Sequence, residues 1–125
     1  MKQYQISNAY DALGMMAAFK LPAKISYELW SLAKKLEPEK MFVEEKKKQL
    51  LSEYHGQVNE RGYVQFPSHE EEQAFIDALN EVAGIDVDID ITPVEVPMAC
   101  LNGIELAMSD IVKLEGFVRF TETEA

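Results

Sequence analysis

The sequence predicts a single α+β domain, mainly α, in which a long kinked helix and an antiparallel second helix pack on a small β-sheet. Two patterns carry this prediction: apolar residues recur at helical spacing from Ile25 to Tyr54, and apolar and acidic residues alternate in "IDVDIDI". With 125 residues, 47% of them hydrophobic, the chain can bury one modest core.

Residues 1–19 are expected to form an N-terminal helix. Asn8 or Ser7 can cap the stretch "AYDALGMMAAF", which places Leu13 and Met16 on one side, before Pro22 interrupts the helix.

Residues 20–55 are expected to form the long helix. From Ala23 onward one apolar seam combines steps of three, four and seven residues, which is typical of an amphipathic helix; it consists of Ile25, Leu29, Leu32, Leu36, Val43, Leu50 and Tyr54. Pro38 lies inside this seam and removes one backbone donor. It should either kink the helix near Glu37 or divide it, with Pro38 opening the second half.

Residues 56–67 are expected to be an extended segment or hairpin, with Gly56 as the helix stop and "YVQF" as a short strand. Residues 68–84 should form an acidic helix that begins with a capping box between Ser68 and Glu71. Gly84 can end this helix in the left-handed conformation. The result is a helical hairpin with one long and one short arm.

Residues 85–125 are expected to form a strand and a short helix. In "IDVDIDI" the isoleucines and valine face one side and the aspartates the other, as in a half-buried strand, with Pro93 and Pro97 suiting an edge or a strand end. "SDIVKLEG" reads as a helix capped by Ser109 and stopped by Gly116, and "FVRF" as a last strand before an acidic tail that frays. The predicted sheet combines the segments near Tyr63, Val87 and Phe117.

The spacing of Asp86, Asp88 and Asp90 matches the first half of a calcium-binding loop. That loop also needs Gly at its sixth position and Glu at its twelfth, and this sequence has Ile91 and Pro97 there. The sequence therefore favours a solvated strand face, followed by an acidic contact surface, over an ion shared with a carboxylate such as Glu95.

Other candidate chemistry is sparse. His55 and His69 lie at expected helix ends and have no second histidine at metal-binding spacing, and Cys100 has no partner. The sequence has no nucleotide-binding loop and no G-x-S-x-G motif. We therefore expect no catalytic residues, no metal ligands and no cofactor.

The aromatic residues Tyr27 and Trp30 lie off the main seam and on one side of the long helix. Packing against the first helix or the C-terminal segment is the favoured interpretation, because large aromatic side chains dominate cores. The alternative is that Trp30 anchors a binding partner.

Charge is divided unevenly along the chain. Residues 1–66 contain 10 Lys/Arg and 8 Asp/Glu, whereas residues 67–125 contain 2 and 14, a net charge of −12. This half would repel phosphates and anionic membranes and attract a basic protein surface. The candidate partner-binding residues are Asp86, Asp88, Asp90, Glu95, Glu70, Glu71 and Trp30.

The segments "KLPAKISYELWSLAKKLEPE", "EEEQAFIDALNEV", "VDIDITPVEV" and "LNGIELAMSDIVKLEGFV" together resemble a family of short phage and prophage proteins of unknown function. The resemblance covers residues 20–118. Its motifs are patterns of helix and strand, and it supplies no residue of known function. It implies an origin in a phage or prophage and action inside a bacterial cell.

The sequence thus suggests a phage or prophage accessory protein that binds a partner with a basic surface, with antagonism of a host protein as one form of this activity. The alternative is a virion morphogenesis or tail-assembly component, in which the long helix forms a homo-oligomer. A metal-dependent enzyme ranks third. No direct nucleic-acid or membrane binding is expected. An intracellular location is expected because the sequence shows no apolar span and no signal-peptide pattern. The resemblance implies that this location is the bacterial cytoplasm, or the virion for the alternative.

Overall fold

The computed structural model describes residues 1–122 and has a mainly helical α+β fold. The elements in chain order are α1 (Gln3–Met16), α2 (Ala23–Glu53), β1 (Gln57–Val58), β2 (Val64–Gln65), α3 (His69–Ala83), β3 (Val94–Pro97), the 3₁₀ turn η1 (Met98–Leu101), α4 (Met108–Leu114) and β4 (Val118–Thr121).

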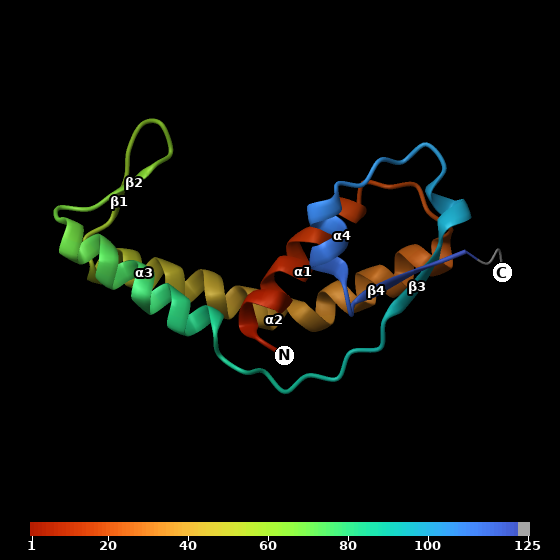
Figure 1. The fold of residues 1–125 in the computed structure, drawn as a ribbon, viewed down its shortest axis with the longest axis horizontal. Coiled ribbons are helices and arrows are strands. Elements are labelled where there is room, and N and C mark those ends of the chain that lie inside the picture. The colour runs from red at the N-terminus through yellow and green to blue at the C-terminus, as the bar shows by residue number, and fades with distance from the viewer. Residues whose placement is uncertain (123–125) are drawn as a thin grey trace.

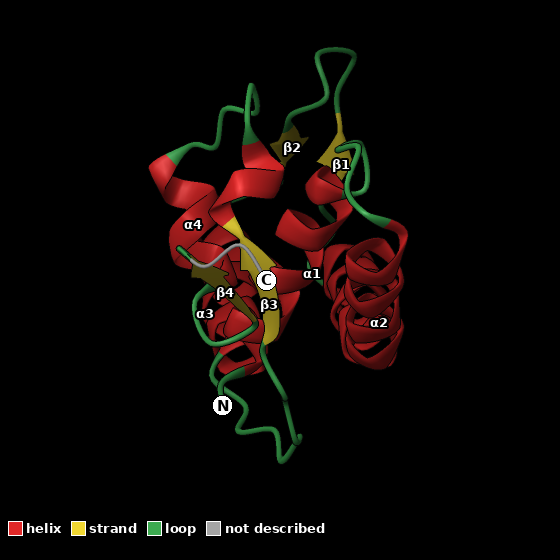
Figure 2. Cartoon of the chain, turned by 90° about the vertical axis from the view of Figure 1, so that its right-hand side faces the viewer, coloured by secondary structure: helices red, strands yellow, loops and turns green. Residues whose placement is uncertain are grey.

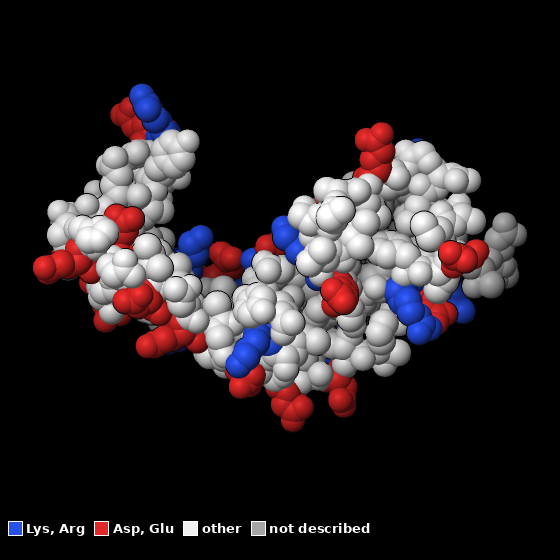
Figure 3. All heavy atoms as spheres, viewed as in Figure 1, with Lys and Arg blue, Asp and Glu red and all other residues white. Residues whose placement is uncertain are grey.

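Helix α2 runs along the molecule, and every other element packs to one side of it. Figure 1 shows α1, α4 and the β3–β4 sheet beside its first half, and α3 with the β1–β2 hairpin beside its second half. Viewed from its end in Figure 2, α2 forms one flank of the molecule by itself. The space-filling view in Figure 3 shows a hollow between the hairpin and the part that contains α1 and α4.

The core lies between α1, the first half of α2, α4 and the β3–β4 sheet. It contains the predicted seam residues Leu29, Leu32 and Leu36, of which Leu36 is fully buried. The other members come from outside α2 and are Ile6, Ala9, Ala12, Leu13, Met16, Val94, Val96, Leu114, Phe117 and Val118. Along the second half of the seam, Val43, Leu50 and Tyr54 are only partly buried. The apolar seam was thus predicted correctly, but only its first half reaches the main core.

Helix α1 begins at Gln3, so the predicted caps at Ser7 and Asn8 are wrong. The Lys2 backbone N–H donates to the side-chain oxygen of Gln5 (2.8 Å), and the Gln3 N–H donates to the carbonyl of Ile85 (2.9 Å). Donors in the first turn of a helix need such partners. Because one of them lies 82 positions away in the chain, a search for a local cap could not find this start.

Helix α2 is continuous through Pro38, so the alternative in which Pro38 opens a second helix is wrong. Figure 1 shows the helix bowed and not straight. Pro38 is exposed and its neighbour Leu36 is fully buried. Packing of the flanking turns therefore holds the helix together although proline removes one of its hydrogen bonds.

A polar clamp joins α1 to the middle of α2. The Lys40 ammonium lies 3.1 Å from the Ser7 hydroxyl, 3.1 Å from the Asp11 carboxylate and 3.2 Å from Glu44. Burial tends to lower the pKa of Lys40, but the bonds to Asp11 and Glu44 outweigh it, and the pKa is raised above its usual value. Lys40 therefore stays charged and fixes the relative position of the two helices.

The C-terminal end of α2 is a Schellman motif built on a histidine. His55 has a φ of 61°, the Gly56 N–H donates to the Leu51 carbonyl (2.7 Å), and the His55 N–H donates to that of Ser52 (3.3 Å). Gly56 is needed for another reason: a Cβ there would lie 2.8 Å from side-chain carbons of Leu51 and Phe66. The glycine allows a close approach, and the residue before it adopts the left-handed conformation.

We predict that His55→Gly raises the free energy of unfolding by about 0.5–1 kcal/mol, because glycine occupies the left-handed region without the Cβ penalty. His55→Ala is the matched control: it removes the same contact between His55 Nδ1 and Glu71 (3.2 Å) but keeps a Cβ. Urea denaturation should rank the glycine variant above both the alanine variant and the wild type. Equal stability of the two variants would contradict the prediction.

Residues 56–67 form an antiparallel hairpin, β1–β2, which pairs Gln57 with Gln65 and Val58 with Val64. Helix α3 then begins at the predicted cap, where the Ser68 hydroxyl accepts from the Glu71 N–H (3.2 Å). Only this half of the predicted capping box forms, and the Glu71 carboxylate contacts His55. It ends at Gly84, whose φ of −89° shows that the predicted left-handed conformation is wrong. Phe75 of α3 is buried and its ring centroid lies 5.0 Å from that of Phe66.

The predicted single sheet is wrong. The hairpin is one sheet, and β3 pairs in parallel with β4 in another, with Val94 opposite Val118. Pro97 is the last residue of β3, as expected for a strand end, and "FVRF" contributes most of β4. The parallel pair requires a crossover, which runs through η1 and α4.

Helix α4 is preceded by Ala107, so the predicted cap at Ser109 is wrong, since Ser109 lies inside the first turn. Gly116 follows the helix with a φ of 85° and turns the chain toward β4. The end of the tail that was expected to fray, 123–125, lies outside the described residues. Within residues 1–122, no helix has both the length and the apolar character that crossing a bilayer requires.

Candidate acidic interaction surface

The three aspartates lie on an extended segment, 85–93, that connects α3 to β3. Only Asp86 forms a bridge, an antiparallel one with Lys2, so the predicted strand at Ile85–Ile91 is wrong. The bridge is held by the Val87 N–H, which donates to the Met1 carbonyl (2.7 Å). Beyond it the segment runs past helices, whose backbone groups are already bonded internally and cannot extend a ladder.

From Val87 onward the alternation has the consequence that the sequence predicts. Val87, Ile89 and Ile91 pack against the core cluster, whereas Asp86, Asp88 and Asp90 are exposed. Ile85 departs from the prediction, since it is 42% exposed. An extended chain directs alternate side chains to opposite sides even without strand partners. The apolar side therefore fixes the segment, and the carboxylates face solvent in a row.

The aspartates differ in their contacts. Asp86 lies 2.9 Å from the Lys2 ammonium, whose hydrogen bond and charge hold the pKa of Asp86 below its usual value. The backbone carbonyl of Asp90 accepts from the Lys35 ammonium, which ties the segment to α2. The carboxylates of Asp88 and Asp90 form no salt bridge within the described residues. These two have the most freedom to pair with a partner.

Glu70 and Glu71 belong to the first turn of α3, together with Glu72. Acidic side chains there favour the helix through its dipole, and the Glu71 carboxylate contacts His55. Figure 3 shows acidic side chains along α3 and onward along the segment that follows it, with few basic ones between them. We call this series, Glu70, Glu71, Glu72, Asp77, Glu81, Asp86, Asp88 and Asp90, the acidic edge.

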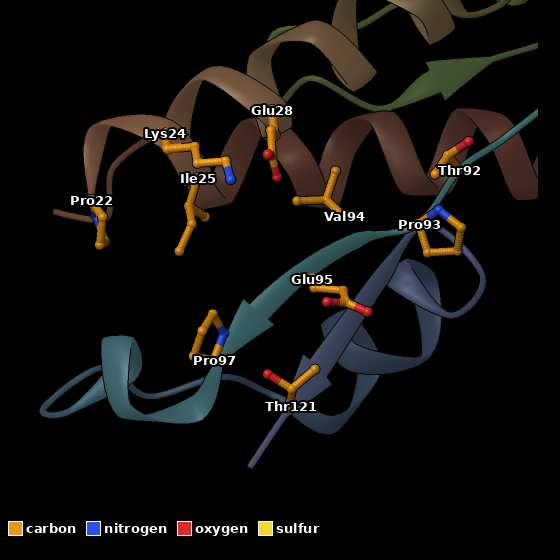
Figure 4. Close-up of a pocket in the computed structure, with 10 residues that line it drawn as sticks. All are labelled: Pro22, Lys24, Ile25, Glu28, Thr92, Pro93, Val94, Glu95, Pro97 and Thr121. Carbon is orange, nitrogen blue, oxygen red and sulfur yellow. The ribbon is translucent and has the colours of Figure 1, made fainter. Parts of the chain in front are cut away.

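Glu95 does not belong to the acidic edge. It lies on β3, forms an ion pair with Arg119 of β4, and borders a groove of about 600 Å³ between the start of α2 and the sheet. Figure 4 shows Lys24, Ile25 and Glu28 on the helix side of this groove, with Pro93 and Pro97 on the strand side. Sequence reasoning missed the groove, because its walls are more than sixty positions apart in the chain.

Trp30 also lies away from the acidic edge. Its side chain is 54% exposed and its ring centroid is 5.8 Å from that of Tyr27, which is 65% exposed. The favoured interpretation, that this pair is packed away, is therefore wrong. Trp30 borders an apolar pocket between α1 and α2, and none of the acidic edge lines that pocket.

The two histidines and the cysteine are not part of the acidic edge. Among residues 1–122, no group of three His, Cys, Asp or Glu side chains is arranged to hold a metal ion. His55 follows α2 and His69 opens α3, as the sequence predicts, and Cys100 lies in the 3₁₀ turn η1.

No protein-family model matches the chain, and no curated protein or solved structure is significantly similar to it.

Proposed function

We propose that this chain is a phage or prophage accessory protein that acts by binding another protein through its acidic edge. The observation that carries the proposal is the row formed by Asp86, Asp88 and Asp90, held in an extended line by the apolar residues between them. A protein whose carboxylates are fixed in position loses less conformational entropy when they pair with a partner.

The spacing of the row defines the partner surface that it fits. Side chains two residues apart on an extended chain are about 6.6 Å apart, so Asp86 to Asp90 spans about 13 Å. Along helix α3 the acidic residues from Glu70 to Glu81 add about 16 Å of further acidic surface. A complementary partner has Lys or Arg side chains along a strip of this length, as proteins that bind nucleic-acid phosphates do.

The biological setting of the proposal comes from the resemblance to phage and prophage proteins. Inside a bacterial cell, occupying the basic surface of a host protein would block its usual anionic ligand. Antagonism of a host protein is therefore the form of this activity that we favour. It requires no catalytic residue, metal ion or cofactor.

Affinity capture from host lysate tests the proposal. The tagged protein should retain a partner at low salt and release it as the salt concentration rises, because screening weakens contacts between exposed charges. A partner whose retention does not depend on salt, or no partner at all, would refute binding through the acidic edge.

We predict that the double variant Asp88→Asn/Asp90→Asn binds the captured partner about three- to tenfold more weakly, since exposed ion pairs each contribute up to about 1 kcal/mol. Glu53→Gln/Glu60→Gln is the matched control, with the same loss of charge at two exposed residues outside the edge. Titration calorimetry should show weakening only for the first pair. Equal weakening by both would indicate a response to net charge alone.

A role in virion or tail assembly is the second candidate. The exposed aromatic pair on α2 favours it, since such a surface suits an oligomer. Light scattering separates the two: a closed ring of many subunits supports assembly, whereas a monomer or dimer supports the accessory factor.

A further inference from the structure

One stripe on the outer side of α2 is exposed and nearly symmetrical in its chemistry. Trp30, Lys34, Glu37 and Met41 follow one another at steps of four, three and four residues, which keeps them on one side of a helix. The two ends are apolar and open, with Trp30 54% and Met41 63% exposed. Between them lie a cation and an anion, joined by a contact of 3.3 Å between Lys34 Nζ and Glu37 Oε2.

Read in the opposite chain direction, the stripe has the same order of residue types: an apolar residue, two charged residues and an apolar residue. If a second copy of α2 packs antiparallel, with the two-fold axis between Lys35 and Leu36, Trp30 faces Met41 of the second copy and Lys34 faces its Glu37. A single register therefore pairs apolar with apolar and cation with anion. Such self-complementarity is what a two-fold interface requires.

A parallel arrangement lacks this match. It would place Lys34 beside Lys34 and Glu37 beside Glu37, and like charges in contact oppose association. It would also align the dipoles of two long helices in the same direction. The order of the four residues thus selects the antiparallel pair.

The end of the stripe at Trp30 borders a pocket that can accept an apolar side chain. The pocket there has a volume of about 270 Å³ and is lined by Leu13, Gly14 and Phe19 of α1 and the following turn, and by Leu29 and Ala33 of α2 among others. Gly14 is a helical residue, and a Cβ at this position would meet no atom within 4 Å. Glycine weakens a helix relative to alanine, so packing within one copy gives no reason for it.

We propose that the protein forms a two-fold dimer through this stripe, in which Met41 of each copy packs on Trp30 of the other beside the pocket that Gly14 helps to line. Methionine suits this role because its flexible thioether adapts to irregular apolar sites and contacts aromatic rings favourably. Four contacts then close the interface: two Trp30–Met41 contacts and two Lys34–Glu37 ion pairs.

The architecture leaves room for such a partner. Figure 2 shows α2 as one flank of the molecule. The acidic segment that follows α3 contacts α2 through the bond from Lys35 to the Asp90 carbonyl, about 100° around the helix from Lys34. The dimer therefore buries the outer side of α2 and leaves the acidic edge of both copies exposed.

Sedimentation velocity across a concentration series tests the dimer directly. The mass should rise from 14.2 kDa toward twice that value. Trp30 is the only tryptophan, so its emission should shift to shorter wavelength over the same concentrations as it leaves water. A monomer at every concentration, or a dimer whose formation leaves Trp30 emission unchanged, would overturn the proposal.

Charge variants test the register. Lys34→Glu and Glu37→Lys should each weaken self-association at least tenfold, because each places like charges opposite one another. Mixed together, the two variants should restore a heterodimer, since every Glu then faces a Lys. Lys46→Glu and Glu53→Lys, at exposed positions of the same helix that lie more than about 120° around it from the stripe, are the matched controls. Two weakened variants that fail to associate on mixing would rule out the antiparallel register.

Substitution at Gly14 tests the pocket. Gly14→Leu should weaken self-association by filling the site while leaving far-UV circular dichroism and unfolding stability of the monomer intact. Should the larger side chain impair folding, Gly14→Ala gives the milder test with the same expected direction. Unchanged self-association in a folded Gly14 variant would exclude the pocket from the interface.

The test of the dimer is independent of the test of the proposed function. Asp88→Asn/Asp90→Asn should leave the dimer unchanged, and Lys34→Glu should leave the salt dependence of partner binding unchanged. Loss of the dimer with retained partner binding would therefore refute only the inference drawn from the α2 stripe.

Discussion

Leu36→Ala is expected to lower the free energy of unfolding by about 2–5 kcal/mol. Leu36 is fully buried in the core cluster that joins α1, α2, α4 and the β3–β4 sheet. Truncation removes apolar area from this cluster and leaves a cavity that rigid neighbouring helices cannot close. Because a domain of this size is stable by only about 5–15 kcal/mol, the loss is a large share of the total.

Urea denaturation followed by circular dichroism measures this effect. Gln49→Ala, at an exposed position of the same helix, is the control and should change stability by less than about 0.5 kcal/mol. A comparably small change for Leu36→Ala would mean that α2 does not carry the core.

Pro38→Ala is expected to raise the free energy of unfolding by about 2 kcal/mol. Proline inside a helix is about 3 kcal/mol less favourable than alanine, and the gain is reduced by about 0.4–1 kcal/mol because proline also restricts the unfolded chain. Pro38 is exposed in the middle of a helix that continues on both sides, so alanine meets no steric conflict and restores the missing N–H.

Pro22→Ala is the matched control. Pro22 precedes α2 with a φ of −52°, a value that proline adopts readily, and no helical hydrogen bond is lost there. This substitution should lower stability slightly, by up to about 1 kcal/mol. Thermal and urea denaturation at low protein concentration measure both changes in the free energy of unfolding. Changes of opposite sign would establish that the position of the proline in the helix decides the effect. A Pro38→Ala variant that is less stable than the wild type would contradict the prediction.

Several elements follow directly from local chemistry. The seam from Ile25 to Leu36, the Ser68 cap and the exposure of the alternating aspartates need only periodicity and capping rules. The stripe from Trp30 to Met41 follows the same helical periodicity on the side of α2 away from the seam. Its mixture of apolar and charged residues is a weaker pattern in sequence than the continuous apolar seam.

Other features depended on distant partners. The start of α1 is set by the Ile85 carbonyl, and the "IDVDIDI" segment is not a strand because helices lie beside it. Strand assignment needs a neighbour with free backbone groups, which alternation cannot reveal. The same limit hid the parallel pairing of β3 with β4, whose crossover includes a short helix.

The sequence by itself determined the mainly helical α+β class, the long helix, the acidic half and the outward direction of Asp86, Asp88 and Asp90, because each follows from the spacing of side chains along a regular backbone. Only the tertiary structure decided that Glu95 pairs with Arg119 away from the acidic edge, that Trp30 is exposed, and that Gly14 lines a pocket. These facts depend on which segments meet in space. That arrangement is selected by the free energy of packing over the whole chain and not by any local pattern.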